Sequence, residues 1–247
     1  MRQRSLGSTL LAALLAGLAS GLVAGLFHLW ATEPVLHRAI DIEHLRQQGN
    51  GRGAEPEMFS RSVQHIGLII GFLLYGVTWG SMFGLVYWYV AGRFAGRRPA
   101  WQGIGLALVG YWTLGIFPQL KYPANLPGVG EAATLSYRQE LYFTFLGLSL
   151  LGAVLTAVVY RDLGRLGAEW RRSLRRVPLT TALYAFYVTA VSVYLPNNPD
   201  PVSMPAALVT RFRWLSLAGI TVFWLVLGAS FVLLMHRRAR QTSPAAP

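Results

Sequence analysis

The stretch FPQLKYPANLPGVG, residues 117–130, divides this chain between strongly apolar segments. It contains three prolines, two glycines and the only lysine of the sequence, Lys121. Proline lacks a backbone N–H and disfavours the helical conformation of the residue before it, so the stretch is predicted to be non-helical. Its free carbonyl groups would have no partner in lipid. The stretch is therefore expected to lie outside the bilayer or along a polar cavity within the protein.

The composition indicates a membrane protein. Of the 247 residues, 53% are hydrophobic and 13% are charged, whereas soluble domains contain about 25% charged residues. The fold class predicted is an all-α polytopic membrane protein, with residues 1–240 as a single integral membrane domain and 241–247 as a disordered tail. Six apolar runs are the predicted spans, at residues 6–30, 66–90, 101–117, 141–160, 177–195 and 214–235.

The first run follows Arg2 and Arg4, as the apolar part of a cleaved signal peptide does. We prefer a retained span, because the run is longer than the core of a signal peptide and no polar region ends it. Small residues recur every four positions in this run and in the second, a pattern that lets two membrane helices approach closely. The two stripes are predicted to pack together: Ala13, Gly17, Gly21 and Gly25 against Gly76, Gly80 and Gly84.

The basic residues predict the orientation. Fourteen of the 22 Lys and Arg residues fall in the alternating set of segments that contains both termini. Basic residues favour the cytoplasmic side, so both termini are expected in the cytoplasm with six spans between them. A five-span arrangement, with the termini on opposite sides, is the alternative. The net charge of +12 is explained by these short loops rather than by a nucleic-acid surface.

This topology collects polar groups on the outer side. A second proline-rich loop, residues 195–205, is expected on the same side as the central stretch. Four imidazole and carboxylate side chains in the segment after the first run are spaced four, four and three residues apart. They share one helical face if a helix restarts at Pro34. Such groups suit Co²⁺, Ni²⁺ and Zn²⁺. The candidate ligands are Glu33, His37, Asp41 and His44, together with His28 inside the first run. The alternatives are a solvated surface helix and, for His28, a histidine hydrogen-bonded at the interface.

Several classes of site are missing from the sequence. There is no cysteine, which excludes thiolate metal sites and disulfides. Lys121 precedes a tyrosine, so no phosphate-binding P-loop is present. The apolar runs hold no carboxylate for a proton relay. The sequence contains no recognisable arrangement of catalytic residues, so the protein is predicted not to be an enzyme. The alternative is a lipid-modifying enzyme that binds an anionic headgroup through Lys121, Arg138 and Arg213.

Three segments resemble the CbtA family of cobalt transporter subunits. The central stretch, followed by Thr134, Arg138 and Tyr142, is similar to the family's P-x-LKYPANPP-x-VG pattern, with Leu126 in place of the first paired proline. A P…FR…S…W pattern matches Pro205, Phe212, Arg213, Ser216 and Trp224. A weaker match lies at Glu33-Pro34 with residues 39–43, where the family's tyrosine is absent and His37 is an unexpected histidine.

The resemblance implies a multi-pass protein of the cell inner (cytoplasmic) membrane, with about five spans, in a cobalt or nickel uptake system that supplies cobalamin synthesis. Co²⁺ is the expected transported ion, entering from the outer face, and no permanently bound cofactor is expected. The implied partner is a small CbtB-like subunit with one span and a histidine-rich motif; a homo-oligomer is also compatible. A non-transporting scaffold or chaperone for a partner metal carrier is the alternative.

We predict a permeation or partner site around the two proline-rich loops. Its residues are Lys121, Tyr122, Pro123, Asn125, Pro127, Arg138, Asn197 and Arg213.

Overall fold

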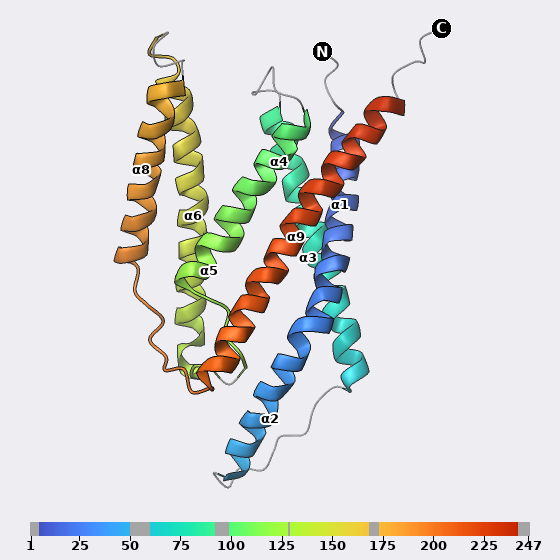
Figure 1. Ribbon diagram of the computed structural model, residues 1–247, viewed down its shortest axis with the longest axis vertical. Coiled ribbons are helices and arrows are strands. Elements are labelled where there is room, and N and C mark those ends of the chain that lie inside the picture. Colours follow the sequence, from blue (N-terminus) through green and yellow to red (C-terminus); the bar gives the residue numbers. More distant parts are fainter. Residues whose placement is uncertain (1–4, 50–59, 92–98, 128, 168–172, 242–247) are drawn as a thin grey trace. The chain divides into compact units, whose positions relative to one another are not determined.

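The computed structural model describes residues 5–49, 60–91, 99–127, 129–167 and 173–241 (Figure 1). Those residues are helical or irregular, and no strand occurs among them. The α-helices are α1 (Leu6–Phe27), α2 (Glu33–Gly49), α3 (Arg61–Ala91), α4 (Pro99–Gly110), α5 (Phe117–Lys121), α6 (Leu135–Leu163), α8 (Ser173–Tyr194) and α9 (Ala206–Gln241). Two π-helical segments, η1 (His28–Thr32) and η2 (Tyr111–Ile116), and a 3₁₀ turn, η3 (Ala132–Thr134), complete the order.

Six helical segments within the described residues are long and apolar enough to cross a membrane, which confirms the predicted all-α class with six spans. They are Leu6–Gly49, Arg61–Ala91, Ala100–Lys121, Leu135–Leu163, Leu174–Tyr194 and Ala206–Arg237. Several extend beyond the apolar runs that predicted them, because an apolar run marks the part that crosses hydrocarbon rather than the ends of the helix. The cytoplasmic location of the termini stays a prediction, and the tail beyond Gln241 lies outside the described residues.

The prediction that all of residues 117–130 are non-helical is wrong at its start. Residues 117–121 form α5, which continues directly from the π-helical segment η2. Pro118 lies in the first turn of α5, where a missing N–H is tolerated. The wider π-helical turn before it already departs from regular helical bonding. The irregular part begins at Tyr122, whose backbone N–H closes the helix on the Pro118 carbonyl oxygen at 2.9 Å.

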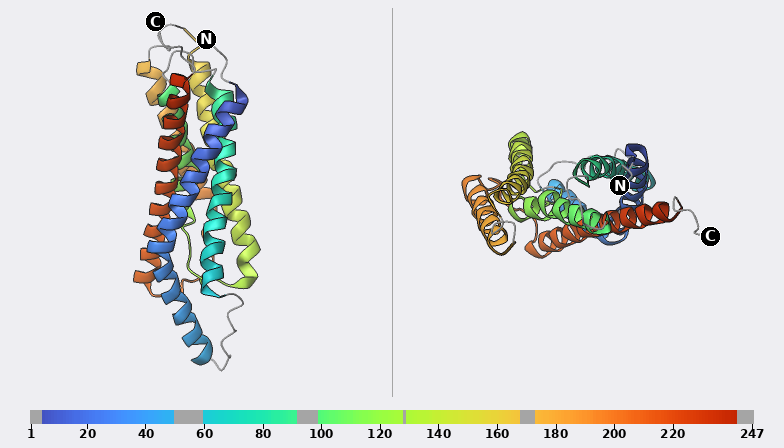
Figure 2. Two further views of the ribbon diagram at one scale, coloured as in Figure 1. Left: turned by 90° about the vertical axis from the view of Figure 1, so that its right-hand side faces the viewer. Right: turned by 90° about the horizontal axis from the view of Figure 1, so that it is seen from above.

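The described helices belong to two compact units. The first comprises Met1–Tyr111, Asn125–Gly128 and Met204–Pro247, and thus contains α1 to α4 and α9. In this unit α1 and α3 lie side by side, as Figures 1 and 2 show. The beginning of α1 and the end of α9 lie at the same end of the unit (Figure 1).

The predicted pairing of the two small-residue stripes is confirmed. A Cβ atom added at Gly80 would lie 2.6 Å from the Ala13 carbonyl oxygen and 2.9 Å from the Gly17 Cα. Gly21 faces the backbone of Phe72, and Gly84 faces the Ala13 side chain. Residues further along α1 therefore meet residues further back in α3, so the two helices are antiparallel. Small residues on both faces let the two backbones approach so closely.

One helical line runs from Leu6 to Gly49 through the π-helical segment η1. Pro34 occupies the second position of α2, as the predicted helical restart requires. At the junction the Glu33 N–H reaches back to the His28 carbonyl oxygen. Helix α2 extends past the first residues of α3 (Figure 2). The polar face of α2 therefore lies beyond the apolar part of the unit.

The second unit comprises Trp112–Ala124 and Val129–Ser203, and thus contains α5, α6 and α8. Its core joins Phe117, Phe145 and Val191, with the partly buried Trp112 and Tyr187 packed against them. Two hydrogen bonds tie the helices together within this core. Ser149 Oγ donates to the Thr113 carbonyl oxygen at 2.6 Å, so this buried hydroxyl has a partner on another helix. Tyr187 OH donates to the Leu148 carbonyl oxygen at 2.8 Å.

Candidate functional site

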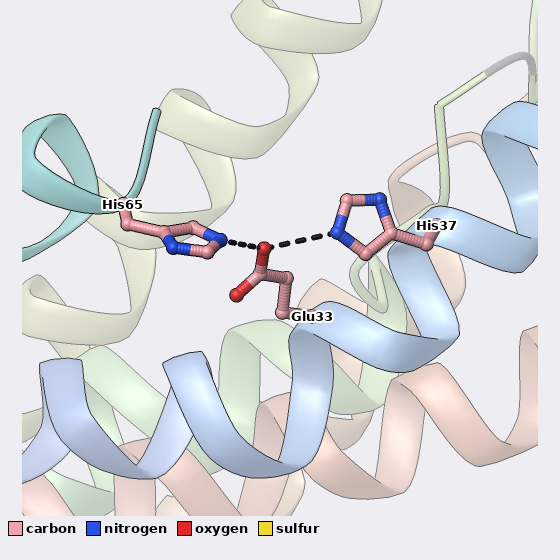
Figure 3. A group of neighbouring side chains, drawn as sticks. All are labelled: Glu33, His37 and His65. Atoms are coloured by element: carbon pink, nitrogen blue, oxygen red, sulfur yellow. Dashed lines mark hydrogen bonds and ion pairs between the residues drawn. The ribbon is translucent and has the colours of Figure 1, made fainter. Parts of the chain in front are cut away.

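Three metal-ligating side chains meet where α2 begins and α3 begins. Glu33 and His37 lie one helical turn apart on α2, and His65 lies in the second turn of α3. His37 Nε2 is 2.9 Å from Glu33 Oε1, and His65 Nε2 contacts the same oxygen. Figure 3 shows this oxygen between the two imidazole rings. One potential ligand atom from each residue lies within 4.8 Å of the others. We call Glu33, His37 and His65 the carboxylate–histidine group.

The carboxylate–histidine group is half-buried and open on one side. The side chains of Glu33, His37 and His65 are 16%, 26% and 43% exposed, so solvent reaches the histidines more readily than the carboxylate. A fourth residue touches the group: Arg61 Nη1 lies 2.6 Å from His37 Nε2 and also contacts Nδ1 of the ring. A guanidinium carries donors only and is always charged, so it uses the imidazole as an acceptor.

The sequence-predicted ligands Asp41 and His44 are not in this group. Asp41 is exposed and His44 is half-buried, both further along α2. His65, which the sequence did not suggest as a ligand, is the third member of the group. A signal for it exists in the glycine pairing. Because Gly21 meets Phe72 and Gly25 meets Ile69 and Phe72, continuing that antiparallel register brings the start of α3 beside Glu33.

His28 lies apart from the carboxylate–histidine group, at the beginning of η1. Its Nδ1 is 2.9 Å from Thr32 Oγ1, one turn along the same helix. Its ring stacks on Phe72, with the centroids 4.9 Å apart and the planes at 16°. The opposite edge of the ring fits against Gly219 of α9, where a Cβ atom would lie 2.5 Å from His28 Cε1. His28 therefore has a hydrogen-bond partner within its own helix, and its position at the membrane interface stays a prediction.

The second unit brings together the end of α5 and the proline-rich loop after α8. Lys121 Nζ donates to Asn197 Oδ1 at 2.6 Å, and Tyr122 OH donates to the Pro196 carbonyl oxygen at 2.6 Å. Burial, with a smaller contribution from nearby Tyr137, raises the pKa of the Tyr122 phenol, so this donor keeps its proton at neutral pH. Pro123, half-buried, follows directly in the chain. The predicted association of the two proline-rich loops is therefore a direct contact in this unit.

Asp200 anchors the same loop to the beginning of α6. Its carboxylate, 3% exposed, accepts hydrogen bonds from Thr134 Oγ1 at 2.6 Å and from the Glu131 N–H at 3.1 Å. Arg138 Nε lies 3.0 Å from Asp200 Oδ2 as an ion pair without an aligned hydrogen bond. Gly130 has a φ of +92° and leaves no room for a side chain beside these groups. Sequence reasoning selected Arg138 but not its buried partner Asp200.

Asn125 and Arg213 form a separate contact in the first unit. Arg213 Nη2 donates to Asn125 Oδ1 at 3.0 Å, and Arg213 Nε is buried without a hydrogen-bond partner among the described residues. Leu126, which follows Asn125, is buried, whereas Pro127 is exposed. The three cations of the lipid-modifying alternative thus have different partners: Lys121 and Arg138 are engaged in the second unit and Arg213 in the first.

These contacts define what each group can do. The proline-loop residues hold one another through hydrogen bonds and an ion pair, which suits a fixed structure or a partner surface. The carboxylate–histidine group holds nitrogen and oxygen donors of the kind that borderline divalent metals prefer. The predicted roles of the individual residues in metal binding and permeation stay predictions.

Comparison with known proteins identifies the family. The sequence model of the family described as "Probable cobalt transporter subunit (CbtA)" matches residues 6–236, nearly the whole chain and every membrane-spanning helix described above. Neither the curated proteins nor the solved structures gave a match. The match covers the central proline-rich stretch, the carboxylate–histidine group and most of both units. The chain therefore belongs to the CbtA family of cobalt transporter subunits.

Proposed function

We propose that this chain is the membrane subunit of an uptake system for Co²⁺, with Ni²⁺ as a second substrate, that supplies cobalamin synthesis. The observation that carries the proposal is the family match over residues 6–236, which spans all six membrane-crossing helices. The family is described as a transporter subunit, and we propose a transport role without catalysis. The multi-pass fold and this role suit the cell inner membrane.

Entry of the metal from the outer face is supported by the distribution of basic residues. The alternating set of segments that contains both termini holds fourteen of the 22 Lys and Arg residues. The positive-inside tendency puts these segments in the cytoplasm. The segment from Glu33 to His65 and both proline-rich loops then face outward. Carboxylate and imidazole groups in the first of these segments capture the metal before it passes between helices.

The word subunit in the family description implies a partner. A small single-span, histidine-rich CbtB-like protein fits this role, because its imidazoles would deliver the same metals that the carboxylate–histidine group accepts. The hydrogen-bonded contact of Lys121 and Tyr122 with residues 196–197 gives such a partner an ordered surface to bind.

The test is uptake of radiolabelled Co²⁺ by cells that lack this chain and by cells in which it is restored, each with the partner present. Restored cells should accumulate Co²⁺ faster, and excess Ni²⁺ should compete. Removing the chain's partner while keeping the chain separates the contributions of the two. Uptake that does not depend on this chain contradicts the proposal.

A scaffold that assembles another metal carrier is the second candidate function. It is favoured by the lack of carboxylates in the central parts of the apolar runs, where coupled transporters often carry them. Purified chain and partner in liposomes distinguish the two functions. A transporter moves Co²⁺ across the vesicle membrane when a gradient is imposed, whereas a scaffold moves none.

A further inference from the structure

The carboxylate–histidine group has the donor atoms of a specific class of metal site. Two imidazole Nε2 atoms and one carboxylate oxygen converge from two helices. Mg²⁺ and Ca²⁺ favour sites built from oxygen donors, whereas Co²⁺, Ni²⁺ and Zn²⁺ accept imidazole nitrogen together with carboxylate oxygen. A three-ligand set leaves coordination positions for water, and such open sites exchange what they hold more readily than closed four-ligand sites.

The backbone holds the three donors in place before any metal arrives. Glu33 and His37 are four residues apart in a regular helix, so their side chains share one face. His65 is carried on α3, whose position beside α1 is fixed by the contact of Gly17 with Gly76 and Gly80. Because the ligand positions follow from helix register, little chain ordering is required when a metal binds.

Arg61 is the resident cation of this group. Its Nη1 approaches His37 Nε2, the nitrogen that also faces Glu33. A lone pair on Nε2 cannot serve a guanidinium donor and a metal ion together, and two cations at this distance repel each other. The arginine and the metal are therefore mutually exclusive at His37. Arg61 also lies one turn before His65 on α3, so the same helix carries the competing cation and one of the ligands.

We infer that Glu33, His37 and His65 form a binding site for a borderline divalent metal ion, Co²⁺ among them, and that Arg61 competes with the metal for His37. This inference deepens the proposed function and rests on it for the identity of the metal. It replaces the predicted helical face of Glu33, His37, Asp41 and His44 with a site that joins two helices. His65 is the most exposed of the three ligands, at 43% of its side chain.

The test is titration of the purified full-length chain in detergent with Co²⁺, followed by visible absorption and calorimetry. Wild-type protein should bind one Co²⁺ ion at this site. Glu33→Gln, His37→Gln and His65→Gln should each weaken binding by about tenfold or more, since loss of even an outer-sphere partner of a metal ligand costs about 10- to 100-fold in affinity. Excess Mg²⁺ should not displace the Co²⁺.

Two further sets of variants separate this site from its competitors. Asp41→Asn and His44→Gln test the helical face, and both should leave the Co²⁺ affinity within about twofold of wild type. Glu43→Gln on α2 and His236→Gln on α9 are matched controls for the loss of a carboxylate and of an imidazole. Arg61→Gln should strengthen Co²⁺ binding, because it removes the competing cation and keeps a side chain of similar length.

The site is overturned if wild-type protein binds no Co²⁺, if the three ligand variants bind as wild type does, or if Asp41→Asn and His44→Gln weaken binding equally. Competition by Arg61 is overturned if Arg61→Gln weakens Co²⁺ binding or leaves it unchanged. Each variant should elute as a single species at the wild-type position in size-exclusion chromatography, which shows that a change in Co²⁺ affinity is not caused by misfolding. Cellular uptake is measured separately. Intact Co²⁺ binding with no chain-dependent uptake contradicts the proposed function alone, whereas chain-dependent uptake with unchanged affinity in the ligand variants contradicts this site alone.

Discussion

Gly17 of α1 and Gly76 of α3 meet backbone to backbone: a Cβ atom at Gly76 would lie 2.9 Å from the Gly17 carbonyl carbon. This contact and its repeats along both helices fix the register of α3 beside α1. The same antiparallel register brings His65 to Glu33, well beyond the last glycine of the stripe. The packing of two glycine faces in the apolar part of the unit thereby determines which polar groups meet at its edge.

Substituting Gly80 tests this register. Gly80→Leu should reduce the folded yield sharply and lower the thermal unfolding temperature, because its side chain would enter the backbone of Ala13 and Gly17. Overpacking costs about 1–3 kcal/mol, and a rigid backbone contact belongs at the upper end. The measurement is size-exclusion chromatography and thermal unfolding in detergent. Gly71→Leu is the matched control, because a Cβ atom there meets nothing within 4 Å. Equal loss in both variants would contradict the pairing.

Asp200→Ala should destabilise the second unit. The carboxylate is 3% exposed and neutralises Arg138, so its removal leaves a partly buried cation without its counter-ion and the Glu131 N–H without its acceptor. Thr134 Oγ1 keeps a second acceptor, the Glu131 carbonyl oxygen. Breaking a buried ion pair from one side costs about 3–5 kcal/mol, and the 20% exposure of Arg138 puts the expected loss near the lower value. Thermal unfolding checks this. Asp200→Asn separates charge from hydrogen bonding, and Asp162→Asn at an exposed ion pair should leave the unfolding temperature unchanged. An unchanged unfolding temperature in Asp200→Ala is the contrary result.

Asn125→Ala should weaken the first unit by about 1–3 kcal/mol, the cost of leaving a buried polar partner unsatisfied. Arg213 loses the acceptor that its Nη2 uses at 3.0 Å, and its buried Nε has no other partner among the described residues to compensate. Thermal unfolding is measured for Asn125→Ala and for Asn125→Asp. The aspartate keeps an acceptor oxygen and adds a negative charge beside Arg213, so it should restore stability. Equal destabilisation by both variants would show that the contact with Arg213 is not the cause.

Gly219→Ala should destabilise α9 by pushing against the ring of His28. The added Cβ atom would lie 2.5 Å from His28 Cε1, with the ring held from its other side by Phe72. His28→Ala removes the ring that the added Cβ atom would meet. The double variant Gly219→Ala/His28→Ala should therefore be destabilised by less than the sum of the two single variants. Coupling between contacting residues is commonly about 0.5–3 kcal/mol. Simple additivity in this double-mutant cycle would mean that the two residues do not touch.

The stability of the folded state should depend on pH in the alkaline range because of the Tyr122 phenol. Its pKa is raised above the unfolded value, first by burial and then by Tyr137, so the folded state binds this proton more tightly than the unfolded state does. Its contribution to stability is therefore fully present below about pH 10 and is lost as pH rises through the folded pKa. Unfolding measured against pH should show a decline there that is smaller in Tyr122→Phe. An unchanged decline in that variant would contradict a role for this phenol.

The sequence by itself determined the number and position of the membrane-crossing helices, because an uncharged run of sufficient length has no other stable place for its apolar surface. It also determined that the Ala13 to Gly25 and Gly76 to Gly84 stripes pack together, since small residues at helical spacing form a continuous face for close approach. The face shared by Glu33 and His37 followed from the same local periodicity.

Only the tertiary structure decided the partners of these local features. Arg213 joins Asn125 across 88 positions of sequence, a separation over which helical periodicity carries no information. His65 reaches Glu33 through the antiparallel register of α1 and α3, which the glycine stripes alone did not specify. Asp200 became the partner of Arg138 because two irregular loops fold against each other in the second unit. In the central stretch, the prolines predicted irregular backbone, which holds for the described residues from Tyr122 to Gly130. Pro118 instead lies in the first turn of α5, directly after the π-helical segment η2. Local residue preferences fix helices, and contacts between helices decide which side chains form a site.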